Sequence, residues 1–273
     1  MNDPDTSTQL AGPGARAALA VYVVVVFVFL VAPLGVAVIL SFSGGTRLVL
    51  PPPEWSLRWF GDAYQNEKFR EGLLNSTLIA LAAAGISAVA GTAGAIAINH
   101  YRFRLRPMIQ AILLMPLSLP GVALGLGILF VLPDYGLAPG NAATILGHAV
   151  LGIPYVATMV LATLANYDLS LEQASMNLGA GRFETFRRVT LPLILPGTIG
   201  GAVCAFLVSF DNVSLSLFIS KGDTLPLRLM QHIQFVADPS VAAIATALIA
   251  MSLVFAVALG LILKQRGNIR LAA

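Results

Sequence analysis

One carboxylate lies well inside an apolar stretch of the sequence. This is Asp211, which has Ser209, Asn212, Ser214 and Ser216 as polar neighbours and no Lys or Arg beside it. A charged side chain is costly within lipid, so it is expected to face the protein interior or a water-filled path. We interpret Asp211, with Ser209, Asn212 and Ser214, as the lining of a path that attracts a cation. The alternative is that Asp211 accepts hydrogen bonds from neighbouring helices and holds them together.

A polar island, residues 170–197, separates two long apolar runs. Ser170 and Gln173 have the spacing of a capping box, which pairs the free amides at the start of a helix. Glu172 lies in the first turn of that helix, where a negative charge suits the helix dipole. Gly179 is followed two residues later by another glycine, and we expect both to end the helix.

A second short helix is predicted directly after this glycine pair. Phe183 and Phe186 would share one of its faces, and Arg187 and Arg188 would lie in its last turn. Pro192 and Pro196 then mark the entry into the next apolar run, because proline is tolerated in the first turn of a helix. The island is therefore expected to be a structured knob of two helices with a bend between them.

The other reactive side chains do not form a recognisable catalytic or metal-binding pattern. The three histidines, His100, His148 and His232, are far apart and lack metal-ligand spacing. We expect His100 to be a solvated loop residue and His148 to form a hydrogen bond between helices. Cys204 is the single cysteine, so no disulfide framework is available. The chain also lacks a Gly-x-Ser-x-Gly nucleophile segment and a phosphate-binding loop, so it cannot hydrolyse ATP by itself.

The composition is that of an integral membrane protein. Of the 273 residues, 57% are hydrophobic and only 11% are charged, whereas a soluble domain carries about 25% charged residues. The net charge of +3 is too small to indicate nucleic-acid binding. The elements that position the polar residues are therefore membrane spans.

Six apolar runs approach the roughly 20 residues that a helix needs to cross the hydrocarbon layer. They cover residues 17–42, 74–98, 108–132, 142–164, 193–219 and 241–263. We expect an N-terminal tail at residues 1–16, a transmembrane domain at residues 17–265 with its core at about 70–264, and a C-terminal tail at residues 266–273. The first run is too long for a cleaved secretory signal, so we interpret it as a retained anchor.

The distribution of Lys and Arg predicts the orientation, because basic residues are enriched on the cytoplasmic side. Ten basic residues would lie on one face and six on the other. The ten are Arg16, Arg102, Arg104, Arg106, Arg182, Arg187, Arg188, Lys264, Arg266 and Arg270. Their face is expected to be cytoplasmic, which places the island and both termini in the cytoplasm.

Two loops are expected on the opposite face. The first, residues 43–71, contains Trp55–Phe60, which we interpret as a short interfacial helix or as a docking segment for a partner. The second, residues 220–240, is a weaker candidate for contact with a solute-delivery protein. Within the spans, Pro116 and Pro120 predict a kink. The glycine pairs 121/125 and 197/201 predict close helix packing.

The island resembles the cytoplasmic loop of the membrane-spanning subunits of binding-protein-dependent ABC importers. The matching residues are Glu172-Gln173-Ala174, Leu178-Gly179-Ala180, Leu191-Pro192 and Pro196-Gly197; Gln173 stands where the family usually has Ala. The resemblance implies an all-α type I importer domain with about six spans. It also implies a coupling helix that binds a separate ATPase through Glu172, Gln173, Ala174, Leu178, Gly179, Arg182, Phe186 and Pro192.

The segment from Ser209 to Phe218 resembles the spermidine/putrescine branch of these importers, as does Asp238–Ala243. Members of this branch often carry a second acid after the first, where this chain has Asn212. The solute implied is a polyamine or a related amine. Relatives of the branch also handle other solutes, so the solute stays open.

The resemblance further implies the partners of the chain. These are a second permease chain (identical or different), a pair of ATPase subunits that hold ATP and Mg, an external solute-binding protein and membrane lipid. No cofactor is expected in this chain, which would be a non-catalytic subunit in the bacterial inner membrane. Two alternatives are an ion-gradient-driven secondary transporter with Asp211 as its proton or sodium site, and a scaffold that transports nothing.

Overall fold

The computed structural model describes residues 13–101, 104–165, 167–236 and 238–254. Its regular structure in these ranges is helical, apart from one isolated antiparallel β-bridge between Ser43 and Trp55. The chain divides into two compact units. The central unit comprises residues 67–231, and the terminal unit comprises residues 1–66 and 232–273.

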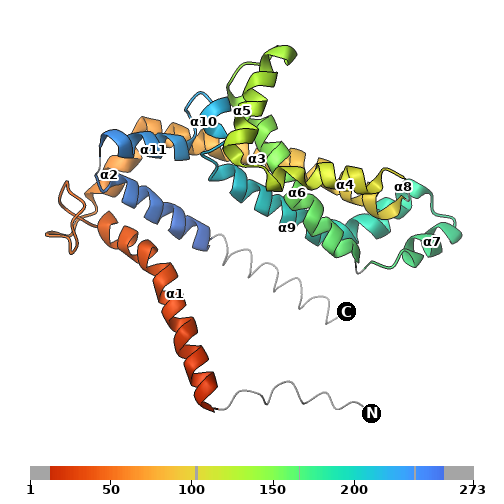
Figure 1. Cartoon of the computed structure of the whole chain (residues 1–273), viewed down its shortest axis with the longest axis horizontal. Coiled ribbons are helices and arrows are strands. Elements are labelled where there is room, and N and C mark those ends of the chain that lie inside the picture. The colour runs from red at the N-terminus through yellow and green to blue at the C-terminus, as the bar shows by residue number, and fades with distance from the viewer. Residues whose placement is uncertain (1–12, 102–103, 166, 237, 255–273) are drawn as a thin grey trace. The chain divides into compact units, whose positions relative to one another are not determined.

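Three long helices pack side by side in the central unit: α3 (Glu67–His100), α6 (Asn141–Ala165) and α9 (Leu191–Phe210) (Figure 1). Their packing depends on small residues, as expected for helices in lipid. A Cβ atom on Gly201 would lie only 2.5 Å from the Val156 Cα, and one on Gly91 would lie 2.7 Å from the Val156 Cβ. The buried core between them consists of Ala84, Ala95, Val156, Val160, Leu164, Ile194 and Ala205.

The predicted kink in the third apolar run is a sharp bend. The helices α4 (Arg106–Leu114) and α5 (Gly121–Val131) each continue into a 3₁₀ turn, Met115–Ser118 and Leu132–Tyr135 respectively. The two resulting segments, Arg106–Ser118 and Gly121–Tyr135, meet at 110°. Proline removes a helical hydrogen bond and disfavours helical geometry before it, which explains a break at this place.

The prediction that the fifth run stays helical to residue 219 is wrong. Helix α9 ends at Phe210, and Asp211 is its C-cap residue. A short helix α10 (Ser216–Ile219) follows, and α11 (Leu225–Phe235) begins further on. The Asn212 Oδ1 accepts a hydrogen bond from the backbone N–H of Leu215 at 2.9 Å. Asp and Asn side chains compete in this way with the helical hydrogen-bond pattern, and hydropathy alone does not report it.

The start of α11 is fastened to the start of α3 within the central unit. The Ser76 Oγ accepts a hydrogen bond from the backbone N–H of Leu225 at 2.9 Å. The Arg228 guanidinium donates to the Glu71 Oε2 through both terminal nitrogens, each at 3.1 Å. Figure 1 shows α11 at the opposite end of the central unit from α7 (Ser170–Asn177) and α8 (Arg182–Thr185).

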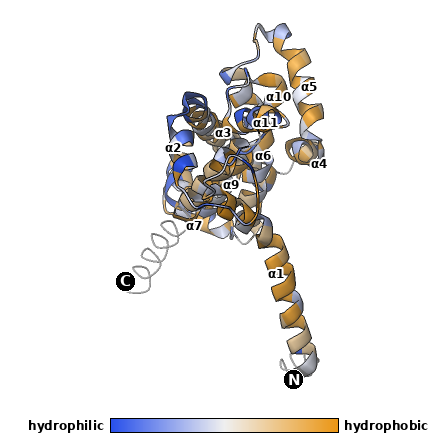
Figure 2. Ribbon diagram, turned by 90° about the vertical axis from the view of Figure 1, so that its left-hand side faces the viewer, coloured by the Kyte–Doolittle hydropathy of each residue, from blue (hydrophilic) through white to orange (hydrophobic). Residues whose placement is uncertain are grey.

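The terminal unit contains α1 (Pro13–Ser41), α2 (Arg58–Gln65) and the helix Ser240–Val254. Helix α1 is apolar along its length (Figure 2), and none of its most apolar window is buried. The expected helix at Trp55–Phe60 begins later than predicted, at Arg58. The Trp59 indole is nearly buried and donates to the Gly45 carbonyl at 3.1 Å, so it is a structural anchor of this loop.

Among the residues that the structure describes, four helices are long and apolar enough to cross a membrane, and the bent pair adds a fifth span if it is counted as one. The four are Gly14–Ser41, Glu67–His100, Asn141–Ala165 and Arg182–Phe210. The sixth predicted span is described only up to Val254. Most of the predicted N-terminal tail and the whole predicted C-terminal tail lie outside the described residues.

Candidate functional site

The predicted helix in the polar island is α7, but its start is built differently from the prediction. The residue before it is Leu169, and no side chain of the expected Ser170–Gln173 capping box bonds to the helix start. Instead, the Asp168 Oδ1 accepts the backbone N–H of Ser170 at 2.9 Å. This backbone hydrogen bond holds the pKa of the Asp168 carboxyl below its ordinary value. The acid that bonds to the backbone at the helix start, Asp168, lies two residues before Ser170. The capping-box pattern of Ser170 and Gln173 therefore did not identify it.

The glycine at the end of α7 has the predicted role. Gly179 has φ +91°, the left-handed region in which glycine is favoured, and the Ala180 N–H returns to the Ser175 carbonyl at 3.2 Å. Gly181 does not end a helix: it has extended backbone and precedes α8. Helix α8 continues through a π-helical turn, Phe186–Thr190, into α9. We refer to residues 170–185 as the knob.

Glu172 does not project from the knob. Its Oε1 accepts three hydrogen bonds: from the Thr190 Oγ1 at 2.5 Å, from the Tyr167 hydroxyl at 2.9 Å and from the His100 Nε2 at 2.9 Å. Only 16% of the Glu172 side chain is exposed. An ionised carboxylate only accepts hydrogen bonds, so the Nε2 of His100 must carry a proton. We call these four side chains the Glu172 cluster.

The hydrogen bonds keep Glu172 ionised. Burial acts to raise the pKa of the Glu172 carboxyl, but the bonds from Thr190, His100 and Tyr167 outweigh it and leave that pKa below its ordinary value. Burial also raises the pKa of the Tyr167 phenol, and the Glu172 carboxylate adds to this. Tyr167 therefore remains a neutral donor at physiological pH.

The prediction that His100 is a solvated loop residue is wrong. His100 is the last residue of α3, and its side chain is only 16% exposed. Its Nδ1 is buried without a hydrogen-bond partner. Three members of the cluster, His100, Glu172 and Thr190, line a cavity of about 370 Å³ together with residues of α7 and α8 that include Met176 and Arg182. Sequence reasoning missed His100, Tyr167 and Thr190 because each lies at the end of an apolar run, where a single polar residue carries no pattern.

The other predicted coupling residues lie mostly on the outer surface of the knob. Leu178 is 89% exposed, and Phe183, which was not among the predicted coupling residues, is 77% exposed. Gln173, Ala174, Gly179, Arg182 and Pro192 are also exposed, and Phe186 is half-buried. The knob thus has an apolar outer face that no other part of the described chain covers, and an inner face that contains Glu172.

The second candidate site is the break after α9. Asp211 is exposed, and no hydrogen bond or ion pair reaches its carboxylate within the described ranges. Ser214 is exposed as well, and its Cβ lies 3.1 Å from the position that a Cβ on Gly121 would take. Asn212 is half-buried and caps the following turn. The break thus places Asp211 and Ser214 at the surface of this chain.

Ser209 belongs to a different environment from Asp211. It is 5% exposed, and its Oγ lies 2.7 Å from the His148 Nδ1. The other nitrogen of His148, Nε2, lies 3.0 Å from the Ser216 Oγ. His148 on α6 therefore bonds to α9 and α10 at once, which confirms the predicted role between helices. Of the four predicted path residues, Ser209 is the one whose side chain forms a hydrogen bond with another side chain, that of His148.

A second cavity, of about 560 Å³, lies between α5 and α6. It is lined by aliphatic side chains, such as Leu124, Ile128 and Val150, with Tyr135 at its edge. Such a lining suits another apolar surface or lipid better than it suits a polar solute.

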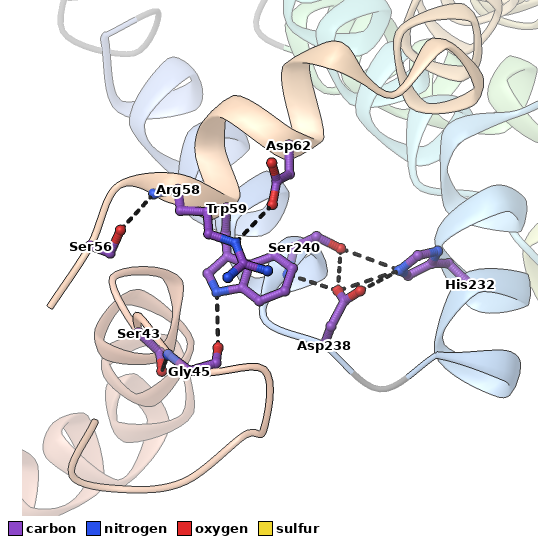
Figure 3. A network of polar contacts seen from close by, with 9 residues as sticks. All are labelled: Ser43, Gly45, Ser56, Arg58, Trp59, Asp62, His232, Asp238 and Ser240. Atoms are coloured by element: carbon purple, nitrogen blue, oxygen red, sulfur yellow. Dashed lines mark hydrogen bonds and ion pairs between the residues drawn. The ribbon is translucent and has the colours of Figure 1, made fainter. Parts of the chain in front are cut away.

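A Ser–His–Asp group occurs in the terminal unit, but its geometry is not that of a hydrolase. The His232 Nε2 lies 3.3 Å from both the Asp238 Oδ2 and the Ser240 Oγ (Figure 3). A catalytic triad needs the acid on one ring nitrogen and the nucleophile on the other. Here both partners share Nε2, and Ser240 is 5% exposed. Among the described residues, no group of three or more His, Cys, Asp or Glu side chains is placed to hold a metal ion.

Comparison with known proteins indicates the class of this chain. Residues 88–266 match the family described as the binding-protein-dependent transport system inner membrane component. This range contains the knob, the Glu172 cluster and the break after α9. The match therefore covers both candidate sites.

Curated relatives resemble the chain over most of their length. The spermidine/putrescine transport system permease protein PotC of Haemophilus influenzae is 28% identical over 90% of this chain and 96% of its own. The putrescine transport system permease protein PotI of Escherichia coli is 33% identical over 81% of each chain. The molybdenum transport system permease protein ModB of Mycobacterium bovis is 30% identical over 69% of this chain and 76% of its own.

Two solved structures share the fold. A bacterial ABC transporter that imports the acidic polysaccharide alginate matches with a TM-score of 0.67 and 16% identity, over 94% of this chain and 99% of its own. An amino acid ABC transporter matches with a TM-score of 0.57 and 18% identity, over 75% of this chain and 96% of its own. The helical arrangement described above is thus that of ABC transporter membrane domains.

Proposed function

Because the chain belongs to the family of binding-protein-dependent transport system inner membrane components, we propose how its two sites divide the work of transport. The chain is a transmembrane permease subunit of an ATP-binding-cassette importer. We propose that the knob faces the cytoplasm and binds a separate ATPase subunit. The break around Asp211 would lie on the solute path. Two observations carry this division: the exposed Asp211 carboxylate, to which no partner among the described residues bonds, and the exposed apolar side chains Leu178 and Phe183 of the knob.

The knob surface supports the ATPase part of the proposal. Leu178 and Phe183 expose large apolar side chains beside the turn at Gly179. Apolar residues that project from a short, well-defined helix pair are typical of a surface that another protein covers. In an ABC importer that protein is the ATPase subunit, which would hold the ATP and Mg. Ten basic residues on the same predicted face favour its cytoplasmic location.

For the solute, we propose a polyamine such as spermidine or putrescine. The names of PotC and PotI support an amine, whereas the name of ModB shows that relatives of similar identity differ in solute. The carboxylate of Asp211 supports an amine over an anion, because a negative charge attracts a cation and repels an anion. In the proposed importer, this chain assembles with a second permease chain, and a solute-binding protein delivers the solute.

The test is uptake by the assembled transporter. The tagged chain would be purified from its native membrane with its accompanying subunits and reconstituted in liposomes with the solute-binding protein. We expect labelled putrescine or spermidine to enter only when hydrolysable ATP is present on the ATPase side. Uptake that continues without ATP and stops when ion gradients are collapsed would overturn the importer mechanism in favour of a secondary transporter. ATP-dependent uptake of an anion but of no amine would overturn the polyamine assignment alone.

A further inference from the structure

The three donors of the Glu172 cluster lie at or next to the ends of three different helices. His100 is the last residue of α3, and Thr190 directly precedes α9. Tyr167 lies two residues beyond Ala165, where α6 ends. A single carboxylate oxygen on α7 therefore bonds to the neighbouring ends of all three long helices of the central unit.

These helix ends are firmly connected to the core. Tyr167 packs against the buried cluster that contains Val160, Leu164 and Ile194. Thr190 is 3% exposed, and the His100 and Tyr167 rings lie 6.4 Å apart. A displacement of Glu172 is thus passed on to side chains that belong to the packed three-helix core rather than to a mobile loop.

The rest of α7 has few such connections. It packs against α8 and the π-helical turn that follows, and the Ser175 Oγ lies 3.1 Å from the Thr185 Oγ1 of α8. These contacts stay within residues 170–190. Most side chains of α7 are exposed. The Glu172 cluster is therefore the direct polar connection from α7 to α3 and to the end of α6.

We propose that Glu172 is a positioning residue that acts inside this chain: its carboxylate fastens α7 to the ends of α3, α6 and α9, so that a push on the knob moves the three helices together. This inference rests on the coupling function proposed above and assigns its internal mechanism. Leu178 and Phe183 receive the push at the outer face, and Glu172 transmits it. Turning Glu172 outward to touch an ATPase would leave the buried hydroxyl of Thr190 and the Tyr167 donor without their acceptor, which is unfavourable.

Two isosteric variants remove single donors without touching Glu172 or the outer face: Thr190→Val and Tyr167→Phe. They would be measured alone and combined with Glu172→Ala in the reconstituted transporter. The matched control is Thr158→Val, which removes a hydroxyl that bonds within its own helix, to the Pro154 carbonyl. The readout is solute imported per ATP hydrolysed, a ratio that does not depend on how much complex assembles, so a loss of folding does not enter it.

We expect each donor variant to lower this ratio by about three- to tenfold, as for the loss of one hydrogen bond, while the ATPase subunits remain bound and Thr158→Val behaves like the wild type. In the Glu172→Ala background neither donor variant should lower it further, because the shared acceptor is already absent. The inference is overturned if both donor variants import normally while Glu172→Ala does not, since Glu172 would then act through an outward contact. Failure of the wild type itself to show ATP-dependent uptake would instead overturn the proposed function.

Discussion

Glu172 and Asp211 are both carboxylates of the central unit, and the chain treats them in opposite ways. Three donors converge on one oxygen of Glu172, and its side chain is 16% exposed. The Asp211 carboxylate is exposed, and no donor bonds to it in the described part of the chain. One acid is held by three donors of this chain through its Oε1, and the other has no such donor in the described part of the chain.

This difference indicates which acid is available to a ligand. A carboxylate that is already satisfied contributes to the geometry of its surroundings, and its removal leaves buried donors unpaired. A carboxylate without partners can bind a cation at little cost to the fold. The two acids should therefore differ in what is lost when each is neutralised. Three experiments test this difference, and a fourth tests the helix core that both sites share.

The largest effect is expected for Asp211→Asn, which removes the charge but keeps the shape. We expect uptake of putrescine to fall by about 10- to 100-fold, as for the loss of a charge-assisted hydrogen bond. Assembly and thermal stability should not change. Asp134→Asn is the matched control, because Asp134 is another exposed carboxylate of the central unit. Equal uptake by the Asp211 variant and the control would show that Asp211 does not face the solute.

Glu172→Gln should lower uptake less than Asp211→Asn does. Its clearer effect should be on the coupling of solute import to ATP hydrolysis. The amide oxygen can still accept hydrogen bonds, but it loses the strength that the negative charge provides. We expect import per ATP hydrolysed to fall by about threefold to tenfold, with the apparent affinity for solute unchanged. A change confined to solute affinity would place Glu172 on the solute path and remove the contrast between the two acids.

Gly201→Ala tests the core that both sites share. The added Cβ would lie 2.5 Å from the Val156 Cα, so α6 and α9 must move apart. Overpacking of this kind costs about 1–3 kcal/mol, and we expect the melting temperature of the purified chain to fall by several degrees. Gly200→Ala is the control, because a Cβ there meets no atom within 4 Å. If the two variants melted at the same temperature, the close approach of these helices would be disproved.

The smallest effect is expected in the pH dependence of stability. The pKa of Glu172 is lower in the folded chain than in the unfolded chain, so its stabilisation is present above the ordinary glutamate pKa and is lost as the pH falls through the lowered value. Wild type and Glu172→Gln should therefore differ in melting temperature at pH 7, by about 2–4 °C. The difference should shrink as the pH falls from the ordinary glutamate pKa through the lowered one. A gap that stays constant down to pH 3 would contradict the assignment.

The apolar runs and the positions of proline and glycine predicted the helices and their ends well. Most contacts of polar side chains were not predicted. The apolar runs predicted α3 and α6, the prolines predicted the bend between α4 and α5, and Gly179 predicted the end of α7. The break at Asp211 was missed because an apolar average does not register the Asn212 side chain, which competes with the helical hydrogen bonds. The Glu172 cluster was missed for another reason. His100, Tyr167 and Thr190 are scattered over 91 positions of the sequence, and only the packing of three helices brings them together.

The termination of α9 at Phe210 has an electrostatic consequence of its own. An α-helix carries the equivalent of about half a negative charge at its carboxyl end, and Asp211 is the residue that caps this end. A cation at the break would therefore meet the macrodipole of a 20-residue helix as well as a side chain. Backbone polarity cannot be mutated away, so even a chain without the acid should retain a residual preference for positive over negative solutes.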